Sequence, residues 1–559
     1  MTIPFGRLAA GLAGAVALGG AVQAAPYQPQ AGLDVEHYVF NLEVADGTRQ
    51  IKGETVVTVR FKTGGVDKVV LDFKARDRKS LGMTVAAVTE GRDGHTVRFS
   101  HQGDQLVLQL PAAPPAGEVR DFRIRYAGEP ADGLVFGTSR YGGERAFVTW
   151  NWPTKIRDWA PTLDHPSSKV TSEWVVTAPE AYAVVANGLL ASELSLGDGR
   201  KTTHWKQSVP IAAWLNAVGV ARFQTWYGGT ARGVPLQVWA PVGAKVDVAN
   251  AFLVARRTID FYGDVVGPYP YEKLGQVVAP LLGGGAMEHA SVVFYGDGGT
   301  RDGAQPMPNR RGDAVALAAY GVMAHEIAHQ WFGDSVTEAG WGDVWLSEGF
   351  ATYFADLYTE RYEGRDAFVA ALRSGRTKAL AAERKERDPV ITPVDDAAGP
   401  DLTQVQYAKG GWVLHMLRQQ VTTPIFFQGI KLYYQRHQGG HATTGDLRRA
   451  MEEVSGQDLQ AFFDQWLTRV DSPKLDVTWT YDAAAKAVTF NIAQQQAGEA
   501  YRLPIEIGVT DEARGALTVL KVDMARKTQV FTIPLAKAPV EMVLDPDTKL
   551  LADMTLAGG

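Results

Sequence analysis

The chain has 559 residues, of which 45% are hydrophobic and 21% charged, and its formal net charge is −6. This length predicts several domains that each bury a core, and the composition is typical of a globular protein. The negative charge and the lack of long lysine or arginine runs argue against nucleic acid or an anionic membrane as the main partner. There are no cysteines, so disulfides and thiolate metal ligands are excluded.

Residues 1–24 have the pattern of an export signal. Arg7 supplies a positive charge, residues 8–22 form an apolar run rich in glycine and alanine, and small residues precede a cleavage site after Ala24. The alternative is an uncleaved membrane anchor, but the run falls short of the ~20 apolar residues that span a bilayer. We therefore expect an exported bacterial protein, periplasmic or secreted, without stable membrane insertion.

The rest of the chain divides into three parts by pattern. Residues 25–225 predict an N-terminal β domain, because segments such as 56–61 and 122–126 alternate as half-buried strands do. Residues 226–471 predict a mainly helical domain, and residues 472–559 predict a small C-terminal β-sandwich. The expected fold class is therefore multidomain α+β.

The helices and strands of the last two parts are predicted from apolar spacing. We expect helices within 249–262, 313–332, 343–362, 409–417, 426–435, 443–454 and 459–467. We expect strands within 477–479, 488–492, 505–509 and 530–533.

The segment His325-Glu326-Ile327-Ala328-His329 carries the most specific chemistry in the chain. On a helix, residues i and i+4 share a face, so the imidazoles of His325 and His329 reach one metal ion. Glu348, in the next helical stretch, is the expected third ligand. Two imidazoles and one carboxylate suit zinc and leave a fourth position for water. We predict one Zn²⁺ per chain, with Glu326 accepting a proton from the activated water.

These segments resemble the gluzincin metallopeptidases of the aminopeptidase N and leukotriene hydrolase family. Residues 325–332 and 345–353 carry the resemblance, and residues 34–38, 462–467 and 543–546 extend it over most of the chain. The resemblance implies a thermolysin-like catalytic domain in which the second helix supplies the glutamate ligand, here Glu348. It also implies that the substrates are peptides.

Two further motifs follow from the same resemblance. Gly285-Ala286-Met287-Glu288 is similar to the family's exopeptidase signature, whose glutamate binds the free α-amine of the substrate. We expect the backbone of this segment to align a peptide as an edge strand does. Tyr407 matches the family's tyrosine that stabilises the tetrahedral oxyanion.

Two residues depart from the family pattern. His289 follows the signature glutamate where the family usually has asparagine, and Trp152 stands where the family has a glutamine or glutamate. A tryptophan does not pair with an ammonium as a carboxylate does, although its face attracts one by a cation–π interaction. Amine recognition is therefore expected to rest on Glu288.

Three functions are compatible with these residues. The leading hypothesis is a zinc aminopeptidase that hydrolyses the N-terminal peptide bond. The alternative is a zinc endopeptidase or oligopeptidase with a relaxed need for a free amine, and a remote alternative is a non-catalytic peptide-binding scaffold. The sequence does not indicate the oligomeric state or the preferred N-terminal residue.

Overall fold

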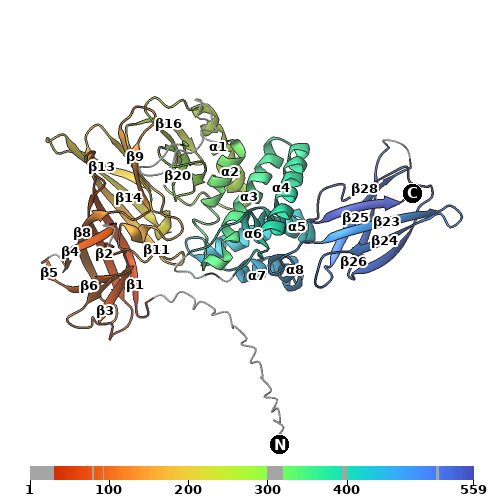
Figure 1. Cartoon of the computed structure of the whole chain (residues 1–559), viewed down its shortest axis with the longest axis horizontal. Helices are drawn as coiled ribbons and strands as arrows, with labels where there is room; N and C mark the ends of the chain where they lie inside the picture. Colours follow the sequence, from red (N-terminus) through yellow and green to blue (C-terminus); the bar gives the residue numbers. More distant parts are fainter. Residues whose placement is uncertain are drawn as a thin grey trace, which may run out of the picture.

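The computed structural model describes residues 30–77, 81–91, 93–298, 319–392, 394, 399–511 and 515–558. They form a β-rich N-terminal part, a helical middle part and a C-terminal part made of strands, arranged along one long axis (Figure 1). The predicted multidomain α+β fold class is therefore confirmed. The predicted export signal, residues 1–24, lies outside the described residues. Within the described residues, no helix combines the length and apolarity needed to cross a bilayer.

The N-terminal part is built on an eight-stranded sheet whose long strands bury every second residue. β2 (Ile51–Phe61) and β11 (Lys169–Pro179) show this alternation most clearly, as the sequence predicts. Smaller sheets of four and three strands complete the part. The remaining strands of the eight-stranded sheet are β13 (Leu189–Ser195), β14 (Arg200–Ala212), β1 (Leu33–Glu43), β8 (Val119–Glu129), β4 (Gly82–Glu90) and β5 (His95–Thr96). The smaller sheets contain β12 (Ala183–Ala186), β15 (Val218–Ala221), β10 (Arg145–Thr149), β9 (Leu134–Thr138), β3 (Lys68–Asp72), β7 (Gln105–Gln109) and β6 (Arg98–Gln102).

A five-stranded sheet connects this β-rich part to the helices, and the sequence patterns did not predict it. Its order is β16-β17-β18-β20-β19, so the two-residue strand β19 lies at one edge. The strands are β16 (Phe223–Ala231), β17 (Val234–Pro241), β18 (Leu274–Ala279), β20 (Val292–Gly296) and β19 (Ala286–Met287). The predicted division after residue 225 falls inside β16, and the division into domains itself stays a prediction.

Helices form the rest of the middle part, and seven predicted helical segments overlap helices of the structure. The described helices are α1 (Val248–Val265), α2 (Tyr320–His329), α3 (Trp345–Tyr362), α4 (Arg365–Glu386), α5 (Gly410–Val421), α6 (Thr423–His437), α7 (Thr444–Ser455) and α8 (Gln460–Leu467). Residues 313–318 of the second predicted helix lie outside the described residues. Helix α4 was not predicted. The turn before α5, Val405–Lys409 (η4), is π-helical. A capping box at Thr443 and Asp446 starts α7.

The C-terminal part consists of two sheets that share one buried core with the helices. Leu475 and Phe490 from one sheet and Ile505 and Ile507 from the other belong to that core. The first sheet contains β27 (Thr528–Pro534), β24 (Ala487–Gln494), β23 (Lys474–Asp482) and β29 (Asp553–Gly558). The second contains β26 (Thr518–Met524), β25 (Leu503–Thr510) and β28 (Glu541–Leu544).

Candidate active site

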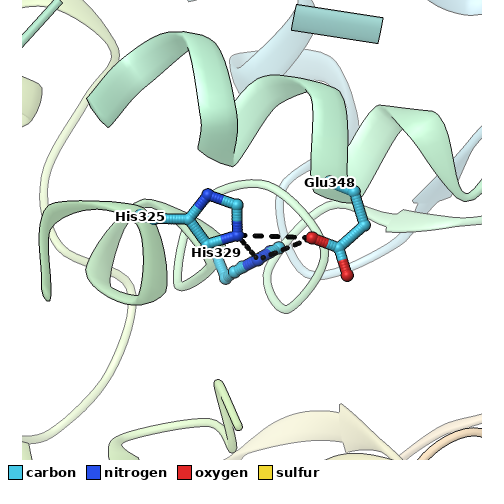
Figure 2. Close-up of side chains that lie close together, drawn as sticks. All are labelled: His325, His329 and Glu348. Carbon is cyan, nitrogen blue, oxygen red and sulfur yellow. Dashed lines mark hydrogen bonds and ion pairs between the residues drawn. The ribbon is translucent and has the colours of Figure 1, made fainter. Parts of the chain in front are cut away.

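Two histidines of α2 and one glutamate of α3 point toward one another (Figure 2). The Nε2 atoms of His325 and His329 are 3.1 Å apart, and each lies 3.3 Å from Oε2 of Glu348. The helical spacing explains the histidine pair, because residues i and i+4 occupy one face. The structure thus brings together the three residues that the sequence predicted as metal ligands.

The donor atoms of this group have the spacing of a metal site. Tetrahedral zinc with bonds of about 2.0–2.2 Å holds its ligand atoms roughly 3.3–3.5 Å apart, close to the distances here. Oε2 of Glu348 is buried and has no hydrogen bond, although buried carboxylate oxygens are normally satisfied. Burial disfavours its charge, but His329 and His325 lower the pKa of Glu348 to about 2. The group therefore fits a zinc ion.

The second ring nitrogen of His329, Nδ1, contacts two oxygen atoms. Nδ1 lies 3.2 Å from the carbonyl oxygen of Phe332 and 2.9 Å from the hydroxyl oxygen of Ser347. These contacts orient the ring and direct Nε2 toward His325 and Glu348. Gly333, at φ +112, makes the approach possible, because a Cβ there would lie 2.2 Å from the Ser347 oxygen.

Glu326 and Tyr407 lie beside this triad. Donor atoms of Glu288, Glu326 and His329 all lie within 4.8 Å of one another. Burial raises the pKa of Glu326 well above its usual value, and the nearby carboxylates of Glu288 and Glu348 add to the shift. The ring of Tyr407 stacks at 6.1 Å from the ring of His325.

Tyr407 reaches the site because two glycines let the backbone segments touch. A Cβ on Gly349 of α3 would lie 2.9 Å from the carbonyl carbon of Gly410, at the start of α5. This close approach packs η4, which carries Tyr407, directly against the helix that carries Glu348. Burial, reinforced by Glu348, raises the pKa of the Tyr407 phenol, so the hydroxyl keeps its proton. The Tyr407 hydroxyl therefore remains a hydrogen-bond donor at neutral and mildly alkaline pH.

Glu288, which directly follows the edge strand β19, brings a further carboxylate to the site. Ala286 and Met287 pair with Tyr295 and Phe294 of β20, and Gly285 precedes them at φ +135. Oε1 of Glu288 lies 3.9 Å from Nδ1 of His329, and its side chain is 7% exposed. Burial raises the pKa of Glu288 to about 7.

Gln330, which the sequence analysis did not single out, joins Glu288 to the metal-binding helix. Its fully buried amide donates to the carbonyl of Glu288 at 2.8 Å and to Oδ2 of Asp334 at 2.8 Å. Its oxygen accepts from the backbone N–H of Ser291 at 2.8 Å and from the hydroxyl of Tyr269 at 3.0 Å. The residue directly after His329 therefore fixes the segment that carries Glu288. Only its position next to the motif could have drawn attention to it in the sequence.

The two residues that depart from the family pattern lie in different surroundings. His289 is buried with its ring edge-on to Phe294, and burial lowers its pKa to about 3. It is therefore neutral and adds no charge beside Glu288. Trp152 packs edge-on against Trp341 at 5.8 Å. The tip of the Trp150 ring lies 4.0 Å from where a Cβ on Gly285 would stand, which places Trp150 beside the β19 segment.

Lys169 connects the N-terminal β-rich part to the same region. From the start of β11, its ammonium donates to the carbonyls of Asp334 and Ser335 at 2.7 Å each, directly beyond the end of α2. Burial lowers the pKa of Lys169 to about 7, against the pull of Asp334 and Glu338. Both oxygens of the nearby Glu338 are buried without a hydrogen bond, and its pKa is raised to about 8 by burial. Glu338 is therefore mostly protonated at neutral pH.

Comparisons with known proteins agree with this geometry. Residues 34–215 match the family model "Peptidase M1 N-terminal domain", and residues 251–466 match "Peptidase family M1 domain". The chain is 29% identical over 368 residues to glutamyl aminopeptidase of Bitis rhinoceros, covering 63% of this chain and 38% of that protein. It is 26% identical over 457 residues to aminopeptidase 2 of Candida albicans, covering 79% of this chain and 48% of that protein.

Human glutamyl aminopeptidase is 28% identical over 332 residues, covering 58% of this chain and 34% of that protein. The chain thus spans about a third to a half of the length of these relatives. The two family models follow one another along the chain in the order of the β-rich and helical parts, and the second includes the predicted metal ligands and Tyr407. The chain therefore belongs to peptidase family M1.

Proposed function

We propose that this protein is a zinc-dependent aminopeptidase that hydrolyses the N-terminal peptide bond of peptides. The observation that supports it most is the buried carboxylate of Glu288, 3.9 Å from His329, beside a group of side chains that fits zinc. A carboxylate at this distance pairs with a substrate ammonium and thereby sets the first peptide bond over the metal ligands. The relatives named above are aminopeptidases by name, which supports the same activity.

Each residue has a separate role in this proposal. His325, His329 and Glu348 would hold the zinc ion, which supplies Lewis-acid activation of a water molecule and of the substrate carbonyl. A carboxylate oxygen of Glu326 accepts the proton from the attacking water and passes it to the leaving amine. The hydroxyl of Tyr407 donates a hydrogen bond to the oxygen that gains negative charge. The edge strand at Gly285, Ala286 and Met287 pairs with the backbone of the peptide.

The test uses matched peptides with a free or an acetylated N-terminus. We expect release of the first residue from the free peptides, loss of this activity with a chelator, and recovery with added zinc. Acetylated peptides should be cut far more slowly, because they lack the ammonium that Glu288 binds. Equal cleavage of both forms would overturn the exopeptidase assignment.

One observation favours the endopeptidase alternative. Trp152 packs against Trp341 at the position where the family resemblance implies a glutamine or glutamate, so this chain offers no second acid for the amine there. Cleavage inside acetylated peptides would support this alternative. Bound zinc at one ion per chain without hydrolysis of any peptide would instead support the peptide-binding scaffold.

We also propose that residues 1–24 direct export. The mature protein purified from the producing bacterium should begin at Ala25, which N-terminal sequencing of the secreted or periplasmic fraction measures. A chain that still begins at Met1 in the membrane fraction would support the anchor alternative.

A further inference from the structure

A cavity of about 320 Å³ has Tyr407 among its lining residues. Four elements line it: α3, α4, η4 and α5. None of its lining residues belongs to residues 285–288 or to the N-terminal β-rich part. The lining residues are Thr352, Asp356, Ala371, Leu372, Ser374, Gly375, Lys378, Gln404, Tyr407, Ala408, Gly411 and Trp412.

The cavity follows α3 outward from the metal ligands. Glu348, Thr352 and Asp356 are four residues apart, so they lie on one face of the helix at successive turns. Thr352 and Asp356 line the cavity, while Glu348 faces the two histidines. Asp356 therefore stands about 12 Å along the helix from Glu348, at 1.5 Å per residue.

Tyr407 forms part of both the site and the cavity, and this relates the cavity to the path of a bound peptide. In the proposed function, Glu288 binds the free amine and Tyr407 faces the carbonyl of the first peptide bond. A chain that runs from Glu288 past Tyr407 and continues along α3 would bring the part beyond the first peptide bond to the cavity. The cavity is thus placed for the leaving part of the peptide.

Asp356 is the acidic residue among those that line the cavity. It is half-buried, and it makes no hydrogen bond or ion pair with any residue in the described part of the chain. Lys378 is the other charged lining residue, and its side chain is exposed at the rim. Lys378 acts on Asp356 only through its charge, so a ligand that brings a cation and hydrogen-bond donors further stabilises this carboxylate.

We propose that this cavity is the subsite for the first residue after the scissile bond, and that Asp356 makes it select a lysine or arginine side chain. This inference rests on the proposed aminopeptidase function. A volume of about 320 Å³ lies at the small end of ligand pockets, which suits one long side chain rather than a longer peptide segment.

The pH dependence of the preference for a basic residue tests the role of Asp356. Burial raises the pKa of Asp356 to about 7, and the charge of Lys378 acts against the shift. Tyr407, the other titratable lining residue, keeps its proton because its own pKa is raised. Asp356 is therefore about half charged near pH 7, and the preference for a basic residue should grow between pH 6 and pH 8.

The experiment measures release of N-terminal alanine from Ala-Xaa-Ala tripeptides, in which Xaa is lysine, glutamine, norleucine or glutamate. For the wild-type zinc enzyme we expect kcat/KM for lysine to exceed that for glutamine by about five- to ten-fold at pH 8. The ratio should shrink at pH 6. Because the two rates are compared as a ratio, pH effects on the shared chemistry cancel.

Two variants act on the ratio in opposite directions. Asp356→Asn should bring the lysine-to-glutamine ratio close to one. Lys378→Gln, a change at the exposed rim, should raise the ratio, and it keeps the test valid where Asp356→Asn does not fold. Glu453→Gln removes an acid from α7, outside the cavity, and should leave the ratio unchanged.

The outcomes separate this inference from the proposed function. Release of alanine from all four peptides at equal rates overturns the subsite and leaves the aminopeptidase intact. A lysine preference that persists in Asp356→Asn, or that appears only at the N-terminal position, also overturns it. No release from any peptide overturns the proposed function and this inference with it.

Discussion

The metal ligands and Glu288 lie in one site but are held there by different means. His325 and His329 share a helix face and are four residues apart, so local geometry alone brings them together. Glu288 stands at the end of an edge strand and is anchored by Gln330, 42 residues further along the chain. Chemistry that depends on local spacing can be read from a sequence, while the placement of substrate-binding groups depends on contacts between distant segments.

Glu326→Gln tests the residues that local helix spacing brings together, and it has the largest expected effect on activity. It keeps the size of the side chain and both histidines but removes the proton acceptor, so kcat should fall by about 10²–10⁴. Zinc content, measured by elemental analysis, should remain at one ion per chain. Retained activity would contradict the role of Glu326, whereas loss of zinc would make it part of the metal site instead.

Tyr407→Phe tests a residue that the glycine contact between α3 and α5 brings to the site. Loss of its hydrogen bond to the developing oxyanion should lower kcat by about 10²–10³ with little change in KM. Steady-state kinetics on an unblocked peptide measure this. Tyr320→Phe, which removes an exposed phenol at the start of α2, is the control and should behave as wild type.

Gln330→Leu tests the contacts between distant segments that hold Glu288 in place. It leaves the N–H of Ser291 and the carbonyl of Glu288 without their partner, so the free energy of unfolding should fall by about 2–4 kcal/mol. We expect KM for free peptides to rise and the preference over acetylated peptides to shrink, with zinc retained.

Gln494→Leu is the matched control for this change. Its buried amide also bonds backbone groups, but between the C-terminal strands. It should cost stability without changing the preference for free peptides. If both variants lose stability equally and Gln330→Leu keeps the full preference, Gln330 has only a structural role.

His415 tests a second long-range contact through pH. Its ring bridges the Tyr353 hydroxyl and the carbonyl of Thr548 in the C-terminal part, and burial lowers its pKa to about 3. The unfolded chain protonates this histidine below about pH 6.5 and the folded chain does not, so its contribution is complete above pH 6.5 and declines below it. From pH 6.5 to pH 5 the wild type should lose about 2 kcal/mol relative to His415→Gln. A pH-independent difference in urea unfolding between the two proteins would contradict this.

The same contrast explains what the sequence could predict. The long strands of the N-terminal sheet alternate with period two, and the helices around the motif carry clear apolar spacing, so both were predicted. The five-stranded sheet was missed because β18 and β20 are short and buried throughout, and such runs do not differ from buried helix segments. Helix α4 was missed because its few buried positions include alanine and glutamate, which give little apolar signal.

The site follows the same rule. His325, Glu326, His329 and Glu348 were named from spacing, while Tyr407 and Glu288 were named from the family resemblance. Gln330, Trp150 and Asp356 were not singled out, because each acquires its position only when distant segments pack together. Asp356 in particular stands out only once α4 and η4 close the cavity around it.

The contact of Lys169 with the two carbonyls beyond α2 has a practical consequence for anyone who works with pieces of this protein. A fragment that begins after residue 225 keeps all the predicted metal ligands yet lacks the cation that holds the turn following them. We expect such a fragment to bind zinc loosely and to be cut readily by proteases at residues 333–336. Activity assays should therefore be made on a chain that includes the β-rich part.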